Sequence, residues 1–599
     1  MACALAVVSI GLFSLVPALH DEKLIRDRLT ARLAGWTGGS VEVSGATHLS
    51  YFPVIALHAN AVRITATNQI PGVRELRTKV MRAEVGLWSL LFDAEPTIQH
   101  LTLSEPLIEL DASPPARGQT ASANLEPALV SALRSAPTSR ITIANGVLNV
   151  SGTGSAEKIT ELSADLTIDG SGAASGEGTF EWRGQQVSVS LKSDSPTVLA
   201  STAKSPVRVD LNSELVTARI EGEAAIADGL QVHGDLELSI ADLRRFTKWM
   251  GLLVPDGPGL GAFKASGTFN WLGKRIAFDD GTFALDGNKA LGAMALKFEG
   301  PRPAIEGTLA LDTLDLAPYL TGPKSGKQRV AKDKEAPVRL DFPILHHLDV
   351  DLRVSTTQIR AAALSFAQSA FSVSLKAGKL SGDFAVFDLC GGKGDGRLEL
   401  NAALPLPRFN VSTTMTGASV QVCIKSFAKE SPVEGKVDLT MSLTSEGRSS
   451  RELLERLGGE LTFSMASGQA NVDLTKVLAM ARKRELRGWA AVTGTPTRFD
   501  SLAARFELEK GNARSDSFKV QTGKTTITGE GTIDLASRRL NWRLSLARRA
   551  AGPLPEIRAL VARLADALVI SGPLSDPIIR LEKKRAGSEG PSAIRAAQQ

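Results

Sequence analysis

Residues 235–240 read Asp-Leu-Glu-Leu-Ser-Ile, and this alternation of polar and apolar side chains decides the fold class. Successive side chains of a β-strand point to opposite faces, so this stretch predicts a strand that is apolar on one face and polar on the other. The pattern recurs in short runs bounded by Gly, Asn, Asp or Pro, at residues 41–45, 60–64, 207–211, 308–311, 397–400 and 525–528. The chain is therefore expected to be mainly β.

The composition agrees with many short strands joined by tight turns. Hydrophobic residues make up 43% of the 599 residues but aromatic residues only 5%, and glycine occurs 54 times. The net charge is +5, from 69 basic and 64 acidic residues. The basic residues form no cluster interleaved with aromatic ones, so we expect no nucleic-acid partner.

A long sheet with one apolar face must hide that face. Helices are predicted at only a few places: 21–36, 85–92, 126–134, 242–253, 448–457, 473–486 and 554–568. These helices are too few to cover the sheet, which could fold onto a second sheet, close into a barrel, or curl into a trough that holds other apolar material. The pattern alone slightly favours a pair of sandwiches, although an aliphatic lining with few rings would suit acyl chains.

The first residues form an apolar segment. Residues 2–19 carry no charge, and as a helix they would span roughly 27 Å, about the hydrocarbon thickness of a bilayer. We expect an uncleaved, single-pass anchor, the alternative being a signal peptide cleaved after the small residues around Ala18. An anchor and a signal peptide would both place the rest of the chain outside the cytoplasm. Because no basic residues precede the apolar segment, the positive-inside rule does not specify how the segment is oriented in the membrane.

The predicted organisation has six parts. They are an anchor at 1–20, a connecting helix at 21–36, an N-terminal β-rich region at 37–321, a flexible basic loop at 322–336, a C-terminal β-rich region at 337–585 and a disordered tail at 586–599.

The chain contains no strong motif for catalysis, metal binding or cofactor binding. It has no G-x-S-x-G and no H-E-x-x-H. The adjacent His346 and His347 would point to opposite faces of a strand, so they could not easily bind one metal ion. The glycines of 391–396 lack the Lys-Ser/Thr ending of a phosphate loop and predict a hairpin turn instead. We therefore expect no enzyme and no cofactor.

Several segments resemble the AsmA family, and they occur in the order found in that family. The segments are Gly-Ser-Val-Glu-Val-Ser-Gly at 39–45, Glu-Pro-Leu-Ile-Glu-Leu at 105–110, Cys-Gly-Gly-Lys-Gly-Asp-Gly at 390–396, Gly-Gly-Glu-Leu-Thr-Phe at 458–463 and Gly-Glu-Gly-Thr-Ile-Asp-Leu at 529–535. Cys390 stands where the family commonly has Tyr, and Asn471 where Gly is usual. The resemblance extends over essentially the whole chain.

This resemblance implies a bacterial inner-membrane anchor, a periplasmic β-rich groove and a role in outer-membrane biogenesis, with phospholipid transfer as the expected activity. It favours the trough over the sandwiches. The expected fold is thus a long, twisted, mostly antiparallel β-sheet curled into a trough with an apolar inner face, plus an N-terminal transmembrane helix and a few short helices. Expected partners are phospholipid acyl chains, the inner membrane, and outer-membrane or periplasmic proteins.

The strand pattern supplies candidate residues for the lining of such a groove: Leu236, Leu238, Ile240, Leu309, Leu311, Leu398 and Leu400. A holdase for outer-membrane proteins in transit would use the same apolar face, so it remains an alternative. Co-purified lipid or co-purified polypeptide would separate the two. An envelope hydrolase is a third alternative.

The two cysteines of the body are expected to form a disulfide. The part of the chain after the apolar segment has two cysteines, Cys390 and Cys423, and an even number allows all of them to pair in an oxidising compartment. The third cysteine, Cys3, lies within the apolar segment. The bond requires predicted strands at 383–389 and 420–424 to come close. The alternative is two separate, small, buried side chains.

The length of the N-terminal segment and its continuity with the helix that follows predict that it stays attached. Detergent should be needed to release the protein from membranes, because a single spanning helix holds a chain in the bilayer. The check is membrane fractionation followed by N-terminal sequencing, and a mature N-terminus near Leu19 would contradict the anchor.

Overall fold

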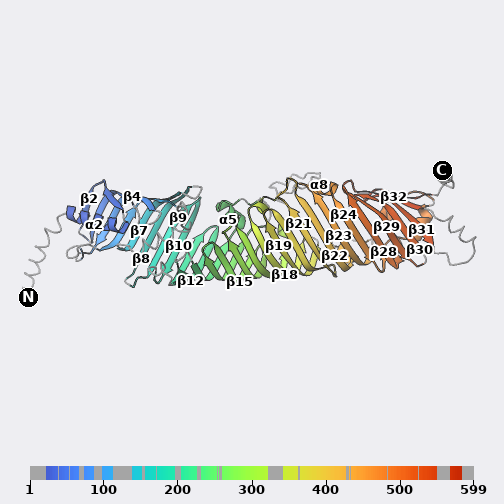
Figure 1. Cartoon of the computed structure of the whole chain (residues 1–599), viewed down its shortest axis with the longest axis horizontal. Coiled ribbons are helices and arrows are strands. Elements are labelled where there is room, and N and C mark those ends of the chain that lie inside the picture. The colour runs from blue at the N-terminus through green and yellow to red at the C-terminus, as the bar shows by residue number, and fades with distance from the viewer. Residues whose placement is uncertain are drawn as a thin grey trace, which may run out of the picture. The chain divides into compact units, whose positions relative to one another are not determined.

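The computed structural model describes residues 22–582 with gaps, of which the longest are 112–137, 321–341 and 549–566. The chain divides into two units. Unit 1 comprises Met1–Val254, Leu260–Gly287 and Leu291–Pro301, and unit 2 comprises Pro255–Gly259, Asn288–Ala290 and Arg302–Gln599. Both units are built mainly from β-strands, as the alternating pattern predicts (Figure 1). The predicted anchor, basic loop and tail lie outside the described residues.

Unit 1 begins with helix α2 (Glu22–Thr37) and continues as a series of strands in which most neighbours are antiparallel. The strands are β1 (Ser40–Val43), β2 (Thr47–Ser50), β3 (Ile55–Thr65), β4 (Val73–Val85), β5 (Ile98–Ser104), β6 (Leu107–Asp111), β7 (Thr138–Ser151), β8 (Glu157–Ile168), β9 (Ala174–Trp182), β10 (Gln185–Ser193), β11 (Ser205–Ser213), β12 (Val216–Ala225), β13 (Gln231–Ile240), β14 (Phe263–Leu272), β15 (Arg275–Leu285) and β16 (Asn288–Lys297). Helix α5 (Leu243–Trp249) joins β13 to β14. Strands β5 and β6 both pair with β7 in parallel.

Unit 2 repeats this plan. Its strands are β17 (Ala304–Asp315), β18 (Asp349–Ala361), β19 (Leu364–Lys376), β20 (Lys379–Leu389), β21 (Gly392–Asn401), β22 (Arg408–Ser419), β23 (Val433–Glu446), β24 (Gly458–Met465), β25 (Gly468–Ala470), β26 (Leu486–Arg487), β27 (Thr497–Phe499), β28 (Ser501–Glu509), β29 (Asn512–Thr522), β30 (Thr525–Asp534), β31 (Arg539–Arg548), β32 (Ala567–Pro573) and β33 (Ile578–Glu582). Its helices are α6 (Ala317–Leu320), η2 (Pro343–His346), α7 (Val420–Lys425), α8 (Ser450–Glu455), α9 (Leu474–Ala481) and η3 (Trp489–Ala491). Among the described strand pairs of this unit, only β17 and β18 are parallel.

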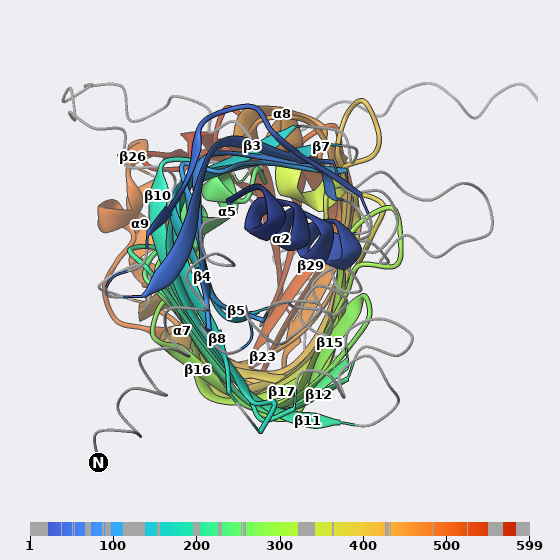
Figure 2. The same ribbon diagram turned by 90° about the vertical axis from the view of Figure 1, so that its left-hand side faces the viewer.

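Helix α2 provides the best-buried core of unit 1. Leu29 and Leu33 are one helical turn apart and are completely buried, because they pack against apolar residues of β2 to β5 such as Leu57 and Leu101. The strands wrap around the helix, which lies on their inner side (Figure 2). The helix predicted at 21–36 is confirmed.

Other predicted helices are confirmed in shorter form. The prediction at 242–253 corresponds to α5, where the Asp242 carboxylate accepts a hydrogen bond from the Arg245 amide and so begins the helix. The predictions at 448–457 and 473–486 correspond to α8 and α9. Those at 126–134, and most of 85–92 and 554–568, lie outside the described residues. From Glu22 onward, no described helix has both the length and the apolar character needed to cross a membrane.

Three local predictions are wrong. Residues 420–424 alternate like a strand but form helix α7, which a disulfide at Cys423 ties to Cys390 in the β20–β21 turn. Only Cys390 and Gly391 form the hairpin turn, with φ of 56° and 76°, and the later glycines belong to strand β21. His346 ends a 3-10 helix and does not lie in a strand.

The buried contact between α2 and the sheet generates a stability prediction. Leu33→Ala should lower the free energy of opening of β3–β5 by about 2–5 kcal/mol, because it leaves a cavity in a fully packed core. Leu211→Ala removes the same atoms from a half-buried site of this unit and should cost about 1 kcal/mol. Hydrogen exchange of the strand amides measures both, and equal effects would contradict the role of α2.

Candidate functional site

The strand register of unit 1 aligns apolar side chains into continuous rows. Residues paired across neighbouring strands point to the same face, so each row crosses the sheet on one side. One such row reads Leu57, Ala83, Leu101, Ile141, Leu166, Gly176, Leu191, Val209, Ile220 and Leu236. It contains no polar side chain, so this face of unit 1 is an apolar surface.

Unit 2 has an equivalent apolar face. Its row reads Leu352, Val373, Gly382, Leu398, Val411, Leu443, Gly459, Leu508, Ala513, Ile533 and Leu540. The residues between these along each strand belong to the opposite face and are mostly charged or hydroxylated. Each unit therefore separates a hydrocarbon face from a polar one.

The apolar face of unit 2 is not filled like an ordinary protein core. In β23, the apolar residues Val437, Leu439, Met441 and Leu443 all remain partly exposed, and the polar residues between them are exposed. A side chain in the core of a sandwich would be almost completely buried. The face is thus accessible to a further apolar partner along much of this strand.

Helices cover the apolar face only locally. In unit 1, the row residues Leu57 and Leu101 are 1% exposed beneath α2, whereas Leu211 and Ile220 on later strands are partly exposed. In unit 2, α9 packs over the last strands and buries Leu568 and Ile579. Within each unit, the strands that its helix leaves uncovered present the open part of the face.

The structure places all seven predicted lining residues on the apolar faces. In unit 1, Leu236 pairs with Ile220, and Leu238 and Ile240 follow it on the same side of β13. In unit 2, Leu309 pairs with Val354, Leu311 lies two residues further along β17, and Leu398 and Leu400 lie on β21 opposite Val411 and Phe409. Ile240 and Leu400 are buried, while Leu398 is 38% exposed. Their contact with lipid stays a prediction.

The sequence analysis missed how the glycines of β21 shape this face. Gly392, Gly394 and Gly396 alternate along the apolar side, and the Phe387 ring covers Gly394, where a Cβ atom would lie 2.6 Å from that ring. Phe387 also contacts Phe384, with ring centroids 6.3 Å apart. The signal was the Gly-x-Gly-x-Gly spacing, which provides room for rings from the neighbouring strand.

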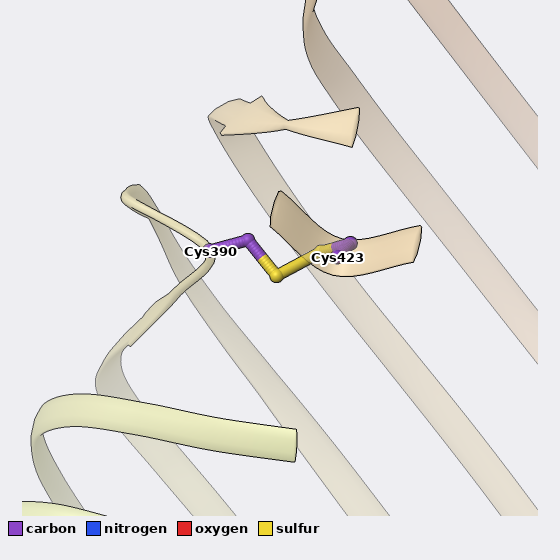
Figure 3. The surroundings of a disulfide bond; sticks show 2 residues. All are labelled: Cys390 and Cys423. Atoms are coloured by element: carbon purple, nitrogen blue, oxygen red, sulfur yellow. A yellow bond between two sulfur atoms is a disulfide. The ribbon is translucent and has the colours of Figure 1, made fainter. Parts of the chain in front are cut away.

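A disulfide bond fixes helix α7 against the β20–β21 turn. The sulfur atoms of Cys390 and Cys423 are bonded, with 5.5 Å between their Cα atoms, as the cysteine count led us to expect (Figure 3). The Ser419 amide also donates to the Cys390 carbonyl at 3.0 Å. A helix of six residues has little stability of its own, so the bond determines where α7 lies.

Ion pairs between neighbouring strands line the polar faces. Arg208 pairs with Glu221 and Arg219 with Asp210 in unit 1, and Arg505 pairs with Glu460 in unit 2. These pairs are about half exposed, so solvent screens them and each adds little to stability. Their main effect is to disfavour alternative strand registers, which would place like charges together.

One polar network in unit 1 has the residue types of a catalytic triad. The His100 Nε2 atom lies 2.9 Å from the Thr142 hydroxyl, and its Nδ1 atom lies 3.6 Å from Glu84. The Thr142 hydroxyl, however, donates to Asp165, and Arg140 binds the same carboxylate and holds the pKa of Asp165 below its ordinary value. Thr142 lies in the middle of β7, where both neighbouring strands bind the backbone amides, so the site offers no oxyanion hole. The network is structural.

Metal binding finds no support in the part of the chain that the structure describes. No group of three or more His, Cys, Asp and Glu side chains there is arranged to hold an ion. The apolar faces are therefore the best candidate for a functional site.

The comparisons with known proteins give one match. The sequence model of the AsmA family matches residues 284–518, which extend from β15 into β29. No curated protein and no solved structure shows significant similarity to the chain. The match supports the resemblance that the sequence motifs indicated.

The disulfide generates a chemical prediction. When the unfolded protein is alkylated without reduction, two fewer thiols should react than after reduction, as counted by mass spectrometry. Replacing both Cys390 and Cys423 with Ser should destabilise α7 and β23 by about 2–4 kcal/mol, because the bond closes a long loop in the unfolded chain. Cys3→Ser is the control and should change neither stability nor the difference in thiol count. Equal counts before and after reduction would contradict the bond.

Proposed function

We propose that this chain, whose residues 284–518 belong to the AsmA family, handles phospholipids along the apolar face of its β-sheet during outer-membrane biogenesis. In this proposal, residues 1–20 anchor the chain in the bacterial inner membrane, and the rest lies in the periplasm. The chain acts by binding and conducting lipid, without catalysis.

The observation that carries the proposal is the partly exposed apolar face of unit 2. Leaving apolar area in water costs about 25 cal/mol per Å², so a sheet that aligns rows of Leu, Val and Ile without covering them needs an apolar partner. Acyl chains can be this apolar partner, because they need no hydrogen bonds from the protein. The aliphatic lining gives them a continuous surface.

Two further observations support the cellular setting. The disulfide between Cys390 and Cys423 is typical of an oxidising compartment such as the periplasm. Family membership supports a role in the cell envelope and in outer-membrane biogenesis. The proposal also includes attachment to the inner membrane, phospholipid as the cargo, and outer-membrane or periplasmic proteins as partners.

The test introduces an aspartate at three sites on the neighbouring strands β21 and β22. Leu398→Asp puts a carboxylate on the open part of the apolar face, where water still reaches it, so the protein should persist while lipid passage is blocked. Leu400→Asp buries the charge at a cost of several kcal/mol, so that protein should be degraded. Ser412→Asp changes the exposed polar face of β22 and should behave like the wild type.

Two readings on each variant decide the outcome: the steady-state protein level by immunoblot and the outer-membrane permeability. A normal level with a leaky envelope for Leu398→Asp supports the lipid conduit. Loss of the protein in Leu398→Asp as well would argue for a closed core. Polypeptide in place of lipid after native purification would favour a holdase for outer-membrane proteins.

A further inference from the structure

The apolar face of unit 2 leads into a cavity of about 450 Å³ near the C-terminal end of the unit. Here β25 leaves the main sheet and pairs with the start of β23 and with β27, forming a small second sheet. The cavity lies between this small sheet, helix α7, the start of α9 and strands β24 and β28 to β31. Its volume is in the range of sites that hold small ligands, about 300–1,000 Å³.

The lining of the cavity is hydrocarbon. All lining residues are apolar except Thr497 and Thr522. The Thr497 hydroxyl donates to the Val472 carbonyl at 2.6 Å, and the Thr522 hydroxyl donates to the Arg498 carbonyl at 2.7 Å. Because both hydroxyl protons are used by the backbone, a ligand inside would meet almost no hydrogen-bonding group. The part of the ligand that enters must itself be hydrocarbon.

The cavity is held open by the elements around it. Val420 and Ile424 of α7 form part of its wall, and the disulfide at Cys423 fixes that helix. The Gly435 amide donates to the Gln421 side chain at 3.1 Å, which joins α7 to β23. An apolar space of this size lowers stability in proportion to its volume unless something fills it.

The cavity is continuous with the open apolar face. Val437 lines the cavity and lies on the same side of β23 as the partly exposed Leu439 and Leu443. A flexible chain lying along the face can therefore enter the cavity end first without crossing a polar barrier.

We propose that this cavity binds the terminal part of one acyl chain of a membrane lipid, while the head group stays outside. The proposal rests on the proposed function, since it names a subsite of the same apolar face. It makes the C-terminal end of unit 2 a place where a lipid is retained by its chain and not by its head group.

The test uses the full-length protein and two photoreactive phosphatidylethanolamines, each with a diazirine on a palmitoyl chain. One probe carries the diazirine at the chain terminus and the other near the carbonyl. After irradiation and proteolysis, mass spectrometry should find the terminal label on peptides of α7, β25 and β29. The carbonyl-proximal label should lie on open-face peptides such as β22.

Two variants sharpen the result. Ala470→Phe places a ring in the cavity and should reduce terminal-label crosslinking there about tenfold, equivalent to the loss of roughly two buried methylene groups. Ser412→Phe adds the same ring on the exposed polar face of β22 and should leave cavity crosslinking unchanged. The comparison of the two probes on the wild type decides the question even if Ala470→Phe does not fold.

The outcomes separate the two proposals. The same peptide distribution for both probes would overturn the chain-end site but leave lipid handling intact. Crosslinks only on the polar faces, or none, would overturn the proposed function itself. A polypeptide found in the cavity after native purification would overturn the acyl-chain assignment.

Discussion

The structure depends on one constraint: each strand must bind its neighbours, most of them antiparallel, through backbone hydrogen bonds in a fixed register. A shift by one residue would move every apolar side chain of a strand to the polar face. The register therefore keeps rows such as Leu352, Val373 and Leu398 continuous across the strands of unit 2. Cross-strand ion pairs on the other face oppose such a shift, although each adds little to stability.

The apolar faces follow from this constraint, and their accessibility follows from how few helices accompany the strands. Helix α2 covers the first strands of unit 1, and α9 covers the last strands of unit 2. On strands that neither helix covers, residues such as Leu443 of β23 remain partly exposed. The molecule thus combines a well-defined backbone with an incompletely covered interior face. That combination is unusual for a self-contained core and suits a protein whose interior partner is a separate molecule.

Much of this arrangement could be predicted from the sequence, because alternation along a strand is a local property. The strands and the side of the sheet on which Leu236 or Leu309 lies follow from it, and the helix at 22–37 follows from apolar residues spaced three and four apart. Helix α7 could not be predicted, because Val420–Lys425 alternates like a strand and its conformation depends on a turn and a disulfide distant in sequence. The exposure of the apolar face also could not be predicted from the sequence. It depends on what packs above each row, and β25 turns away from the main sheet to pair with β27.

The neighbour-by-neighbour pairing of strands has a consequence for how such a protein can evolve. Within each unit, most strands bind only the strand before and the strand after them in the chain, as β9 to β14 do. Insertion or loss of a whole hairpin preserves the alternation on both sides, since two strands restore the original direction of the chain. The number of strands can therefore change by duplication or deletion without redesign of the rest. Such a sheet behaves as an extensible array, whose reach is set by gene length and whose chemistry is set by a two-residue period.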